Sequence, residues 1–373
     1  MAEQMDWIGI VRALGRGFSE KTAEHDATDT FVTESYAALQ SNGVFAAGVP
    51  AELGGGGASH AELCEMIREV AHHCSSTALA LSMHTHLVAS MAYIWRSGNT
   101  AVEPLLHRVA TEGLILVTSG ASDWLAGSGQ FEKVDGGYRL TGRKRFCSGA
   151  PAGHVLLTTG VYDDPQEGPI VVHVPLALDA PGVTVLDTWH VLGMRGTGSN
   201  DIQLEGVFIP DAAMSGVRRP AGKWHPFVHI VTLIALPLIY AAYRGIAETA
   251  RSLAIEMAKS RKSDPNVAYT VGEMENQLVT AQLAHVSLID LATSSPPGPE
   301  TTSAALIRRT ILANAVMRTV EKAMEVAGGG AFYRSAHLER MFRDIQGARY
   351  HLLPEKSQTR YTGRVLLGLD IDT

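Results

Sequence analysis

The chain is poor in cysteine. Its 373 residues include three cysteines, Cys64, Cys74 and Cys147, none of which form a CxxC pair. An odd number of cysteines without that spacing indicates neither a disulfide framework nor a zinc cluster, so we expect reduced thiols. Carboxylates at ligand spacing are also missing beside the histidines, and we therefore expect no metal site.

Long basic runs and long apolar runs are missing as well. The chain has 31 basic and 38 acidic residues, a net charge of −7, and no basic cluster suited to a phosphate backbone, which disfavours nucleic-acid binding. The apolar stretch at residues 228–243 is shorter than a membrane span of about 18 residues and contains Pro237. Residues 1–16 lack the apolar core of a signal peptide. We expect a cytoplasmic protein that does not cross a membrane.

The remaining composition, 46% hydrophobic and 18% charged, is typical of a globular protein with two or three packed domains. Apolar residues recur with helical spacing over residues 1–112, and short β-rich runs separated by Gly, Asp and Pro occupy residues 113–218. Helical spacing returns over residues 219–373. We predict an α+β fold with an N-terminal all-α domain, a central β domain and a C-terminal helical bundle.

Individual elements follow from the same patterns. The clearest predicted helices are residues 61–70, 76–95, 238–259, 273–291, 303–327 and 338–352. The clearest predicted strands are residues 138–140, 155–159, 170–174 and 202–209. Residues 293–302 contain three prolines and form a predicted interhelical loop.

Short motifs stand along the chain in a recognisable order. Residues 118–123 read Thr-Ser-Gly-Ala-Ser-Asp, residues 144–149 read Lys-Arg-Phe-Cys-Ser-Gly, and residues 189–199 contain Arg-Gly-Thr-Gly-Ser. Near the end come three glycines at 328–330, then Leu-Glu-Arg, Arg343-Asp344 and finally His-Leu at 351 and 352. Over nearly the whole chain, this order resembles the acyl-CoA dehydrogenase superfamily of flavoproteins.

The resemblance implies a C-terminal four-helix bundle that joins the β domain around a flavin, and assembly as a homotetramer. It also implies that the Ser148 hydroxyl faces flavin N5 and that Thr118 donates near N1. Ser119, Ser122 and Phe146 belong to the same flavin-contacting segments. A hydroxyl suits N5 because it can donate to the oxidised nitrogen or accept from the reduced N5–H. The alternative interpretation of Ser148 is a turn residue.

The phosphate end of the implied flavin site departs from the family pattern. Arg261 stands where the family has an arginine that reaches the flavin diphosphate of a neighbouring subunit. Gly328 and Gly329 remain from a glycine-rich segment, which here contains Glu325 and Ala331. A lost amide donor and an added carboxylate weaken the hold on an ADP diphosphate, so we expect either FAD or FMN as the flavin.

The carboxylate base of a dehydrogenase is missing from both positions where the family places it. The eighth residue after Asp344 is Leu352, and the alternative earlier positions hold Ala235 and Leu236. Loss of a general base costs about 100- to 10,000-fold in rate. The local motifs are instead most similar to the flavin-dependent monooxygenase branch, which includes two-component aromatic hydroxylases and dibenzothiophene monooxygenase.

Two histidines are candidate acid–base groups in that branch. His351 is the first candidate, and His84 in the Met-His-Thr-His run of an N-terminal helix is the second. A histidine with a reference pKa of about 6.5 can donate or accept a proton where reduced flavin meets O2. Alternatively, His351 only satisfies the dipole at a helix end. His86 cannot share a pocket with His84, because residues two apart on a helix point about 200° apart.

We therefore expect a monooxygenase that uses O2 and reduced flavin. The flavin would come from a separate reductase, because no GxGxxG unit for a nicotinamide cofactor stands between a predicted strand and helix. The substrate would be small and apolar or aromatic, in a pocket lined by Phe227, Leu233, Leu236 and Tyr240, although a buried helix would show the same residues. The alternatives are an acyl-CoA dehydrogenase with a non-standard base and a non-enzymatic member of the fold.

Overall fold

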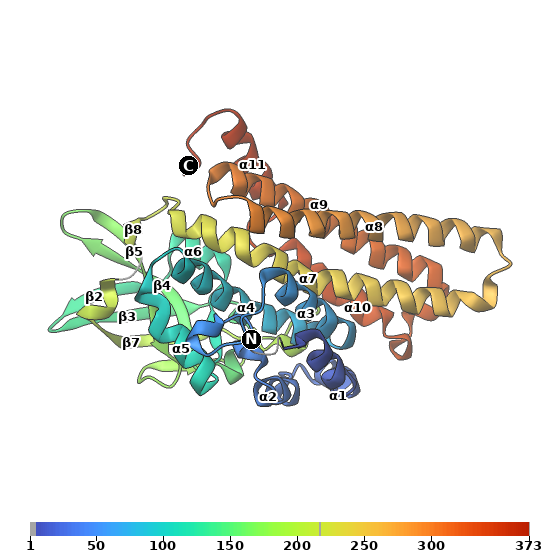
Figure 1. Ribbon diagram of the computed structural model, residues 1–373, viewed down its shortest axis with the longest axis horizontal. Helices are drawn as coiled ribbons and strands as arrows, with labels where there is room; N and C mark the ends of the chain where they lie inside the picture. Colours follow the sequence, from blue (N-terminus) through green and yellow to red (C-terminus); the bar gives the residue numbers. More distant parts are fainter. Residues whose placement is uncertain (1–4, 216–217, 373) are drawn as a thin grey trace.

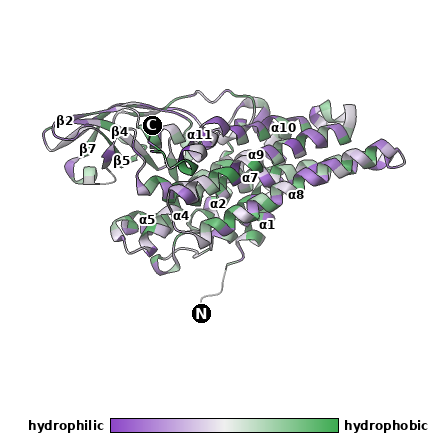
Figure 2. Cartoon of the chain, turned by 90° about the horizontal axis from the view of Figure 1, so that it is seen from above, coloured by the Kyte–Doolittle hydropathy of each residue, from purple (hydrophilic) through white to green (hydrophobic). Residues whose placement is uncertain are grey.

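The computed structural model describes residues 5–215 and 218–372 of the chain. Helices come first, a β-sheet follows, and long helices complete the chain (Figure 1). In Figure 1 and in Figure 2, which is turned by 90°, the sheet lies at one end of the molecule and the bundle extends toward the other. The α+β class and the predicted order of helix, sheet and helix are therefore confirmed.

The N-terminal helices surround one buried helix. They are α1 (Trp7–Thr28), α2 (Thr33–Ser41), α3 (His60–His73), α4 (Ser75–Arg96) and α5 (Glu103–Glu112), with the 3-10 helices η1 (Val44–Ala46), η2 (Ala51–Leu53) and η3 (Thr100–Val102). A capping box starts α3, because the Ser59 hydroxyl accepts from the Glu62 N–H while the Glu62 carboxylate accepts from the Ser59 N–H. Helix α4 is buried on nearly all sides, as expected of a helix between other helices and a sheet.

Within the described residues the central domain forms an eight-stranded sheet of order β6–β7–β3–β2–β4–β5–β8, with β1 paired to β4. The strands are β1 (Leu116–Thr118), β2 (Gln130–Val134), β3 (Gly137–Lys144), β4 (Val155–Asp164), β5 (Gly168–Ala177), β6 (Val183–Val185), β7 (Ile202–Pro210) and β8 (Arg218–Pro220). Their connections contain α6 (Ala121–Ala126), η4 (Ala150–Ala152), η5 (Arg195–Thr197) and η6 (Asp211–Ser215). Strand β4 pairs in parallel with β1 and β2, and the other pairs are antiparallel.

A buried charge network fastens the segment after β1 to the sheet. Lys144 is 0% exposed and donates to both carboxylate oxygens of Asp123 and to two backbone carbonyls. The Asp123 carboxylate also accepts from the hydroxyls of Ser119, Ser128 and Thr158. Both charges are thus paired and hydrogen-bonded inside the domain, which is the condition for keeping them away from water.

The C-terminal part is a helical bundle. It contains α7 (Pro226–Ala258), α8 (Pro265–Ser294), α9 (Pro299–Ala327), α10 (Leu338–Asp344) and α11 (Glu355–Leu366), with η7 (Lys259–Arg261), η8 (Gly328–Phe332), η9 (Arg334–Ala336) and η10 (Ile345–Arg349). Helix α7 contacts α3, α4, α8 and α9 and is their common core element. Among the described residues one helix, Pro226–Arg261, is long and apolar enough to cross a membrane, but 78% of its apolar window is buried inside the protein.

Two histidines hold the proline turn of α7. Pro237 lies inside the helix and has no N–H to donate. Nε2 of His60 donates to the Ile234 carbonyl at 2.9 Å, and Nε2 of His285 donates to the Pro237 carbonyl at 2.8 Å. These bonds connect α3 and α8 to α7 where its own hydrogen bonding is interrupted.

Some boundaries differ from the sequence-based expectations. The predicted helix over residues 338–352 ends at Asp344, and after η10 the chain makes a turn that carries His351. Helix α11 was not predicted, and β8 extends the sheet beyond the expected limit at residue 218. Residues 216–217, Met1 and Thr373, which belong to the predicted domain limits, lie outside the described residues. The limits at 112/113 and 218/219 remain predictions.

Candidate functional site

Two loops that dock on each other form the candidate cofactor face. Residues 146–149 follow β3, and residues 189–200 precede β7. The Cys147 N–H donates to the Asn200 carbonyl at 3.2 Å, and the Gly149 N–H donates to the Thr197 carbonyl at 2.9 Å. Phe146 has a φ of 61°, a conformation that a bulky residue adopts only where its surroundings hold it.

Three hydroxyl groups form a chain that ends at Ser148. Its Oγ lies 2.7 Å from Ser199 Oγ, which lies 2.7 Å from Thr197 Oγ1. Thr197 donates to the Met194 carbonyl at 2.9 Å, and Trp189 Nε1 donates to the same carbonyl at 3.0 Å. Ser148, Ser199 and Thr197 are 9%, 3% and 0% exposed, so Ser148 is the member of the chain closest to solvent.

Apolar side chains of the same two loops are exposed. Phe146 is 58% exposed and Leu192 is 62% exposed, and Phe146 meets Trp189 edge to face with ring centroids 6.3 Å apart. Gly120 approaches Phe146 so closely that a Cβ would lie 3.2 Å from its ring. An exposed aromatic face close to a hydroxyl is a surface on which a flat heteroaromatic ring can bind.

The Arg343-Asp344 pair attaches the 189–200 loop to the last helices. The buried Asp344 carboxylate accepts from the Met194 N–H and from the Ser75 hydroxyl, both at 2.5 Å. Burial raises the pKa of Asp344. Arg343 forms an ion pair with Asp26 of α1 at 2.6 Å. The two side chains therefore act as connectors, and the Asp344 carboxylate is occupied.

A buried arginine holds the turn that carries His351. Arg309 is 1% exposed and donates through Nη2 to three backbone carbonyls of this turn, including that of His351 at 2.7 Å. Carbonyls at a helix end carry partial negative charge and stabilise a cation there. Leu352 and Leu353, which follow His351, have positive φ values of 23° and 56° and depend on this support.

His351 pairs with Tyr243 of α7. Its Nε2 lies 2.5 Å from the Tyr243 hydroxyl. Burial raises the pKa of Tyr243, and burial together with Arg309 and His86 lowers the pKa of His351 to about 3. Both groups are therefore neutral at pH 7, and an acid–base role for His351 stays a prediction.

The hydrogen bond between these two groups also orients His351. Because the buried phenol has one hydrogen and His351 as its recorded partner, its O–H donates to Nε2. The imidazole hydrogen is then on Nδ1. Among the described residues no hydrogen-bond partner is recorded for this Nδ1–H, so it can donate to a ligand.

The two histidines of α4 have different surroundings. His84 donates through Nε2 to the Phe45 carbonyl at 2.8 Å and accepts through Nδ1 from the Leu116 N–H at 2.9 Å. Both of its ring nitrogens are used, so it connects α4 to η1 and β1 and cannot serve a ligand. His86 is 5% exposed, donates through Nδ1 to a carbonyl one turn earlier at 3.1 Å, and is close enough to His351 to lower its pKa. Its Nε2 is an acceptor.

Two of the flavin-segment hydroxyls, those of Thr118 and Ser119, are used inside the protein. Thr118 accepts from Trp124 Nε1 at 2.6 Å and donates to the Ser119 carbonyl at 3.2 Å. The Ser119 hydroxyl donates to Asp123 in the buried charge network. Ser122 is exposed on α6. Neither Thr118 nor Ser119 offers a free hydroxyl hydrogen, so their contribution to the flavin site stays a prediction.

The predicted phosphate residues come together at the end of α9. Arg261 Nη2 donates to the Val326 carbonyl at 2.6 Å, and a Cβ at Gly328 would lie 3.3 Å from Arg261 Nη1. Gly329 is exposed beside it. The structure therefore joins η7 and η8, and a phosphate role for these residues stays a prediction.

Most of the predicted substrate residues are core residues. Leu233, Leu236 and Tyr240 are 2%, 0% and 0% exposed and belong to the apolar core of the bundle. Phe227, at the start of α7, is half-buried and stacks on Trp124 with centroids 5.6 Å apart. Leu233, Leu236 and Tyr240 therefore fit the alternative interpretation, that of core residues of a buried helix. Phe227 remains a candidate for substrate contact.

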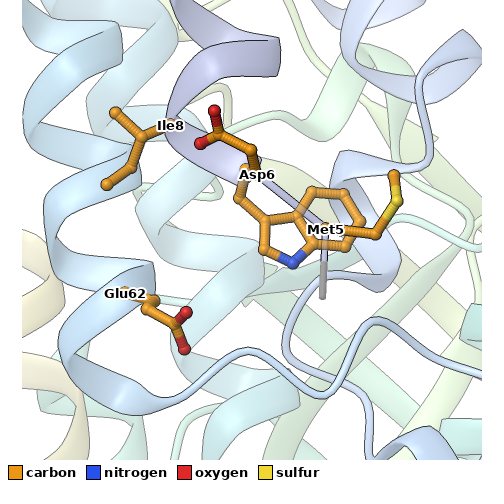
Figure 3. Close-up of a pocket in the computed structure, with 5 residues that line it drawn as sticks. Met5, Asp6, Ile8 and Glu62 are labelled. Atoms are coloured by element: carbon orange, nitrogen blue, oxygen red, sulfur yellow. The ribbon is translucent and has the colours of Figure 1, made fainter. Parts of the chain in front are cut away.

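The described residues contain no second candidate site in the form of a metal cluster, and a surface pocket near the start of α1 is not one either. Among the described residues no group of three or more His, Cys, Asp or Glu could hold a metal ion. A surface pocket of about 240 Å³ is lined by Met5, Asp6, Trp7, Ile8 and Glu62. Figure 3 shows how the labelled side chains of Met5, Asp6, Ile8 and Glu62 lie. The two carboxylates of the pocket already accept from backbone N–H groups at the starts of α1 and α3, so we assign the pocket no chemistry.

Comparisons with known proteins match the three predicted domains to one enzyme family. The N-terminal, middle and C-terminal domains of acyl-CoA dehydrogenases match residues 8–111, 118–207 and 237–355. A putative acyl-CoA dehydrogenase of Bacillus subtilis is 26% identical over 94% of this chain and 93% of its own. L-evernosamine nitrososynthase of a Micromonospora species is 28% identical over 95% and 88% of the two chains.

A monooxygenase and a flavin complex are also similar to this chain. A dibenzothiophene monooxygenase of Mycolicibacterium goodii is 28% identical over 75% of this chain and 72% of its own. The solved structure of KijD3 with FMN and a dTDP-linked amino sugar covers 100% of this chain and 96% of that one, with 24% identity and a TM-score of 0.88. The matched domains, their order and the fold show that the chain belongs to the acyl-CoA dehydrogenase superfamily of flavin-dependent enzymes, which includes monooxygenases and nitrososynthases.

Proposed function

We propose that this protein is a flavin-dependent monooxygenase that uses O2 to oxygenate a small apolar or aromatic substrate. The observation that carries the proposal is the neutral His351–Tyr243 pair, 2.5 Å apart, beside the sequence position where dehydrogenases of the superfamily have a carboxylate. A neutral imidazole can donate and accept hydrogen bonds. With a pKa of about 3, however, it is too weak a base to remove the α-proton of a thioester.

The alternative positions for a dehydrogenase base support the same conclusion. Leu352 follows His351, and Ala235 and Leu236 are 4% and 0% exposed in the bundle core. Asp344 is a carboxylate close to this turn in the sequence, but it already accepts from Met194 and Ser75. None of these positions supplies a carboxylate that could reach a substrate.

The two docked loops fit a flavin ring. Ser148 offers a hydroxyl at the solvent end of a buried chain, and the exposed Phe146 offers an apolar face in the same loop. Reduced flavin would supply the electrons that activate O2, which side chains alone cannot do. Ser148 would hold the N5 edge, and Phe146 would help to keep water away from the ring. The FMN complex of KijD3, a protein of the same fold, supports this assignment.

The histidines would supply hydrogen bonds next to the flavin. The Nδ1–H of His351 is a donor and Nε2 of His86 is an acceptor, and both rings are neutral at pH 7 because burial lowers their pKa values to about 3 and about 4. Tyr243 and Arg309 act as positioning residues, since one fixes the tautomer of His351 and the other holds its backbone. We replace His84 by His86 as the second candidate, because both ring nitrogens of His84 are occupied.

The proposed function also implies a redox partner and an oligomeric state. A separate reductase would deliver the flavin, because the sequence contains no nicotinamide-binding motif. Exposed apolar side chains on α8 and α9 support assembly through the bundle, which we propose to be a homotetramer; they are Val279, Leu283, Val286, Ile307 and Ile311. A cytoplasmic location remains a prediction.

The central test supplies the purified protein with FMN, a flavin reductase and NADH in the presence of ¹⁸O2. We expect incorporation of one ¹⁸O atom into an aromatic test substrate such as indole, and less free hydrogen peroxide when that substrate is present. The competing function is tested by adding butyryl-CoA or octanoyl-CoA to the oxidised flavoprotein. Rapid bleaching of the flavin by either thioester, without oxygen incorporation, would favour a dehydrogenase and refute the proposal.

Replacing His351 by alanine should uncouple the reaction. We expect the oxygenated product to fall by about 100-fold or more, because the site loses its free imidazole donor, while O2 consumption continues and yields hydrogen peroxide. The matched control is His107→Ala, a substitution at an exposed histidine of α5. Product and peroxide are measured together, and full coupling in His351→Ala would remove His351 from the mechanism.

FMN and FAD should bind with affinities within about tenfold of each other, a difference of about 1.4 kcal/mol. The reason is the altered phosphate segment, in which Arg261 already donates to Val326 and Glu325 adds a negative charge. Equilibrium titration monitored by flavin fluorescence measures both constants. Recovery of the protein with one FAD per chain that survives dialysis would contradict this expectation.

A further inference from the structure

We propose that Thr197 and Ser199 set the direction of the hydrogen bonds at Ser148, so that the site binds reduced flavin more tightly than oxidised flavin. This inference rests on the proposed function, because it concerns the hydroxyl that would face flavin N5. It adds two buried positioning residues that do not touch the flavin themselves. It also gives the site a way to distinguish the flavin that it must accept from the flavin that it must release.

The direction of the hydrogen bonds follows from counting the hydrogens of the three hydroxyls, Thr197, Ser199 and Ser148. Each hydroxyl has one hydrogen to donate. Thr197 gives its hydrogen to the Met194 carbonyl, 2.9 Å away, which can only accept. Ser199 then donates to Thr197, and Ser148 donates to Ser199, each over 2.7 Å. Ser148 is left with lone pairs on its solvent side, and it can accept from the N5–H of reduced flavin.

The opposite direction is available but loses one hydrogen bond. To donate to the bare N5 of oxidised flavin, Ser148 must accept from Ser199, and Ser199 must accept from Thr197. The Thr197 hydroxyl then no longer donates to the Met194 carbonyl, which keeps its bonds from the Thr197 N–H at 3.1 Å and from Trp189 Nε1 at 3.0 Å. One neutral hydrogen bond corresponds to about a fivefold preference for the first direction.

Burial and anchoring make this preference effective. Thr197 is 0% exposed and Ser199 is 3% exposed, so water does not readily replace a missing partner at either hydroxyl. The terminal carbonyl is also held in place, because the Met194 N–H donates to the buried Asp344 carboxylate at 2.5 Å. The last helices therefore hold the far end of the chain that orients Ser148.

The test compares the affinities of oxidised and reduced FMN, with no substrate and no turnover. Both dissociation constants are measured anaerobically by quenching of tryptophan fluorescence, with FMN reduced by light. For the unmutated protein we expect a constant for oxidised FMN about fivefold larger than that for reduced FMN. In Thr197→Val, Ser199 loses its acceptor and turns its hydrogen toward Ser148, so the ratio of the two constants should fall by about fivefold to tenfold.

Three further variants separate this effect from a general loss of structure. Thr197→Ser keeps the hydroxyl and should keep the ratio, and Ser199→Ala breaks the chain and should bring the ratio close to one. The matched control is Thr319→Val on α9, because Thr319 is also 0% exposed and its hydroxyl donates to a backbone carbonyl at 2.8 Å. We expect this control to leave the ratio unchanged.

The outcomes distinguish the inference from the function on which it rests. If Thr197→Val and Ser199→Ala weaken both forms of FMN equally, or change neither, the hydroxyl chain does not select the redox state and the inference is overturned. If the unmutated protein binds neither form below about 1 mM, the flavin site itself is wrong and the proposed function fails with it. A falling ratio in both variants, with Thr197→Ser unchanged, supports the inference.

Discussion

Replacing Lys144 by methionine is expected to lower the free energy of unfolding by about 3 to 5 kcal/mol. Methionine fills a similar volume but leaves the Asp123 carboxylate, which is 6% exposed, buried without its cation. The carboxylate would retain its hydroxyl donors, Ser119, Ser128 and Thr158, which lessen but do not remove the cost. The midpoint of urea denaturation, followed by circular dichroism, measures the change.

A surface pair provides the control for this experiment. Lys133 forms an ion pair with Asp211, and their side chains are 45% and 55% exposed. Lys133→Met should leave the denaturation midpoint almost unchanged, because water solvates the carboxylate that is left. Adding Asp123→Asn to Lys144→Met should recover part of the lost stability, since the uncompensated charge is then gone. Equal costs for the two lysine variants would show that the buried pair does not stabilise the sheet domain.

Stability should fall steeply as the pH drops from about 6.5 toward 4.5. Burial lowers the pKa of His84, His86 and His285 to about 4 and that of His351 to about 3. In the unfolded chain these histidines titrate near pH 6.5. Below that pH the unfolded state binds more protons than the folded state. The histidines' contribution to the free energy of unfolding is therefore complete above about pH 6.5 and decreases as the pH falls toward the folded pKa values.

The expected effect is large because several histidines contribute in the same direction. Each contributes on the order of 3 kcal/mol when the pH reaches its folded pKa. Denaturation midpoints at half-unit steps between pH 7 and 4.5 measure the slope. His285→Gln should make the slope shallower by about one proton, whereas His107→Gln, at an exposed position, should not change it. A stability that stays constant over this range would contradict the burial of these imidazoles as neutral groups.

Much of the fold was predictable because the signals are local. Helical spacing over residues 1–112 and 219–373, and short β-rich runs between them, correspond to the observed order of helix, sheet and helix. The end of the chain was predicted less well. Helical spacing continues past Asp344, but the observed helix α10 ends there, and the following turn depends on Arg309, which is 42 residues from His351 in the sequence.

The candidate site was predictable only in part. The motif at residues 144–149 selected Ser148, but its partner Ser199 lies 51 residues later, and no spacing rule connects them. The choice between His84 and His86 could not be made from their helix, because both are buried. What separates them is the partner of each ring: a carbonyl and an N–H from two other elements occupy His84, while His86 is near His351.

The sequence by itself determined the superfamily, the α+β architecture and the absence of a carboxylate at the expected base positions, because motif order and residue identity carry that information. Only the tertiary structure decided which titratable groups are neutral, which polar groups already have a hydrogen-bond partner inside the protein, and which can bind a ligand. Burial lowers the pKa of His351 to about 3, Asp344 is used to hold Met194, and two hydroxyls align behind Ser148. These properties arise from contacts between residues far apart in the chain, since hydrogen bonding and desolvation depend on what surrounds a side chain.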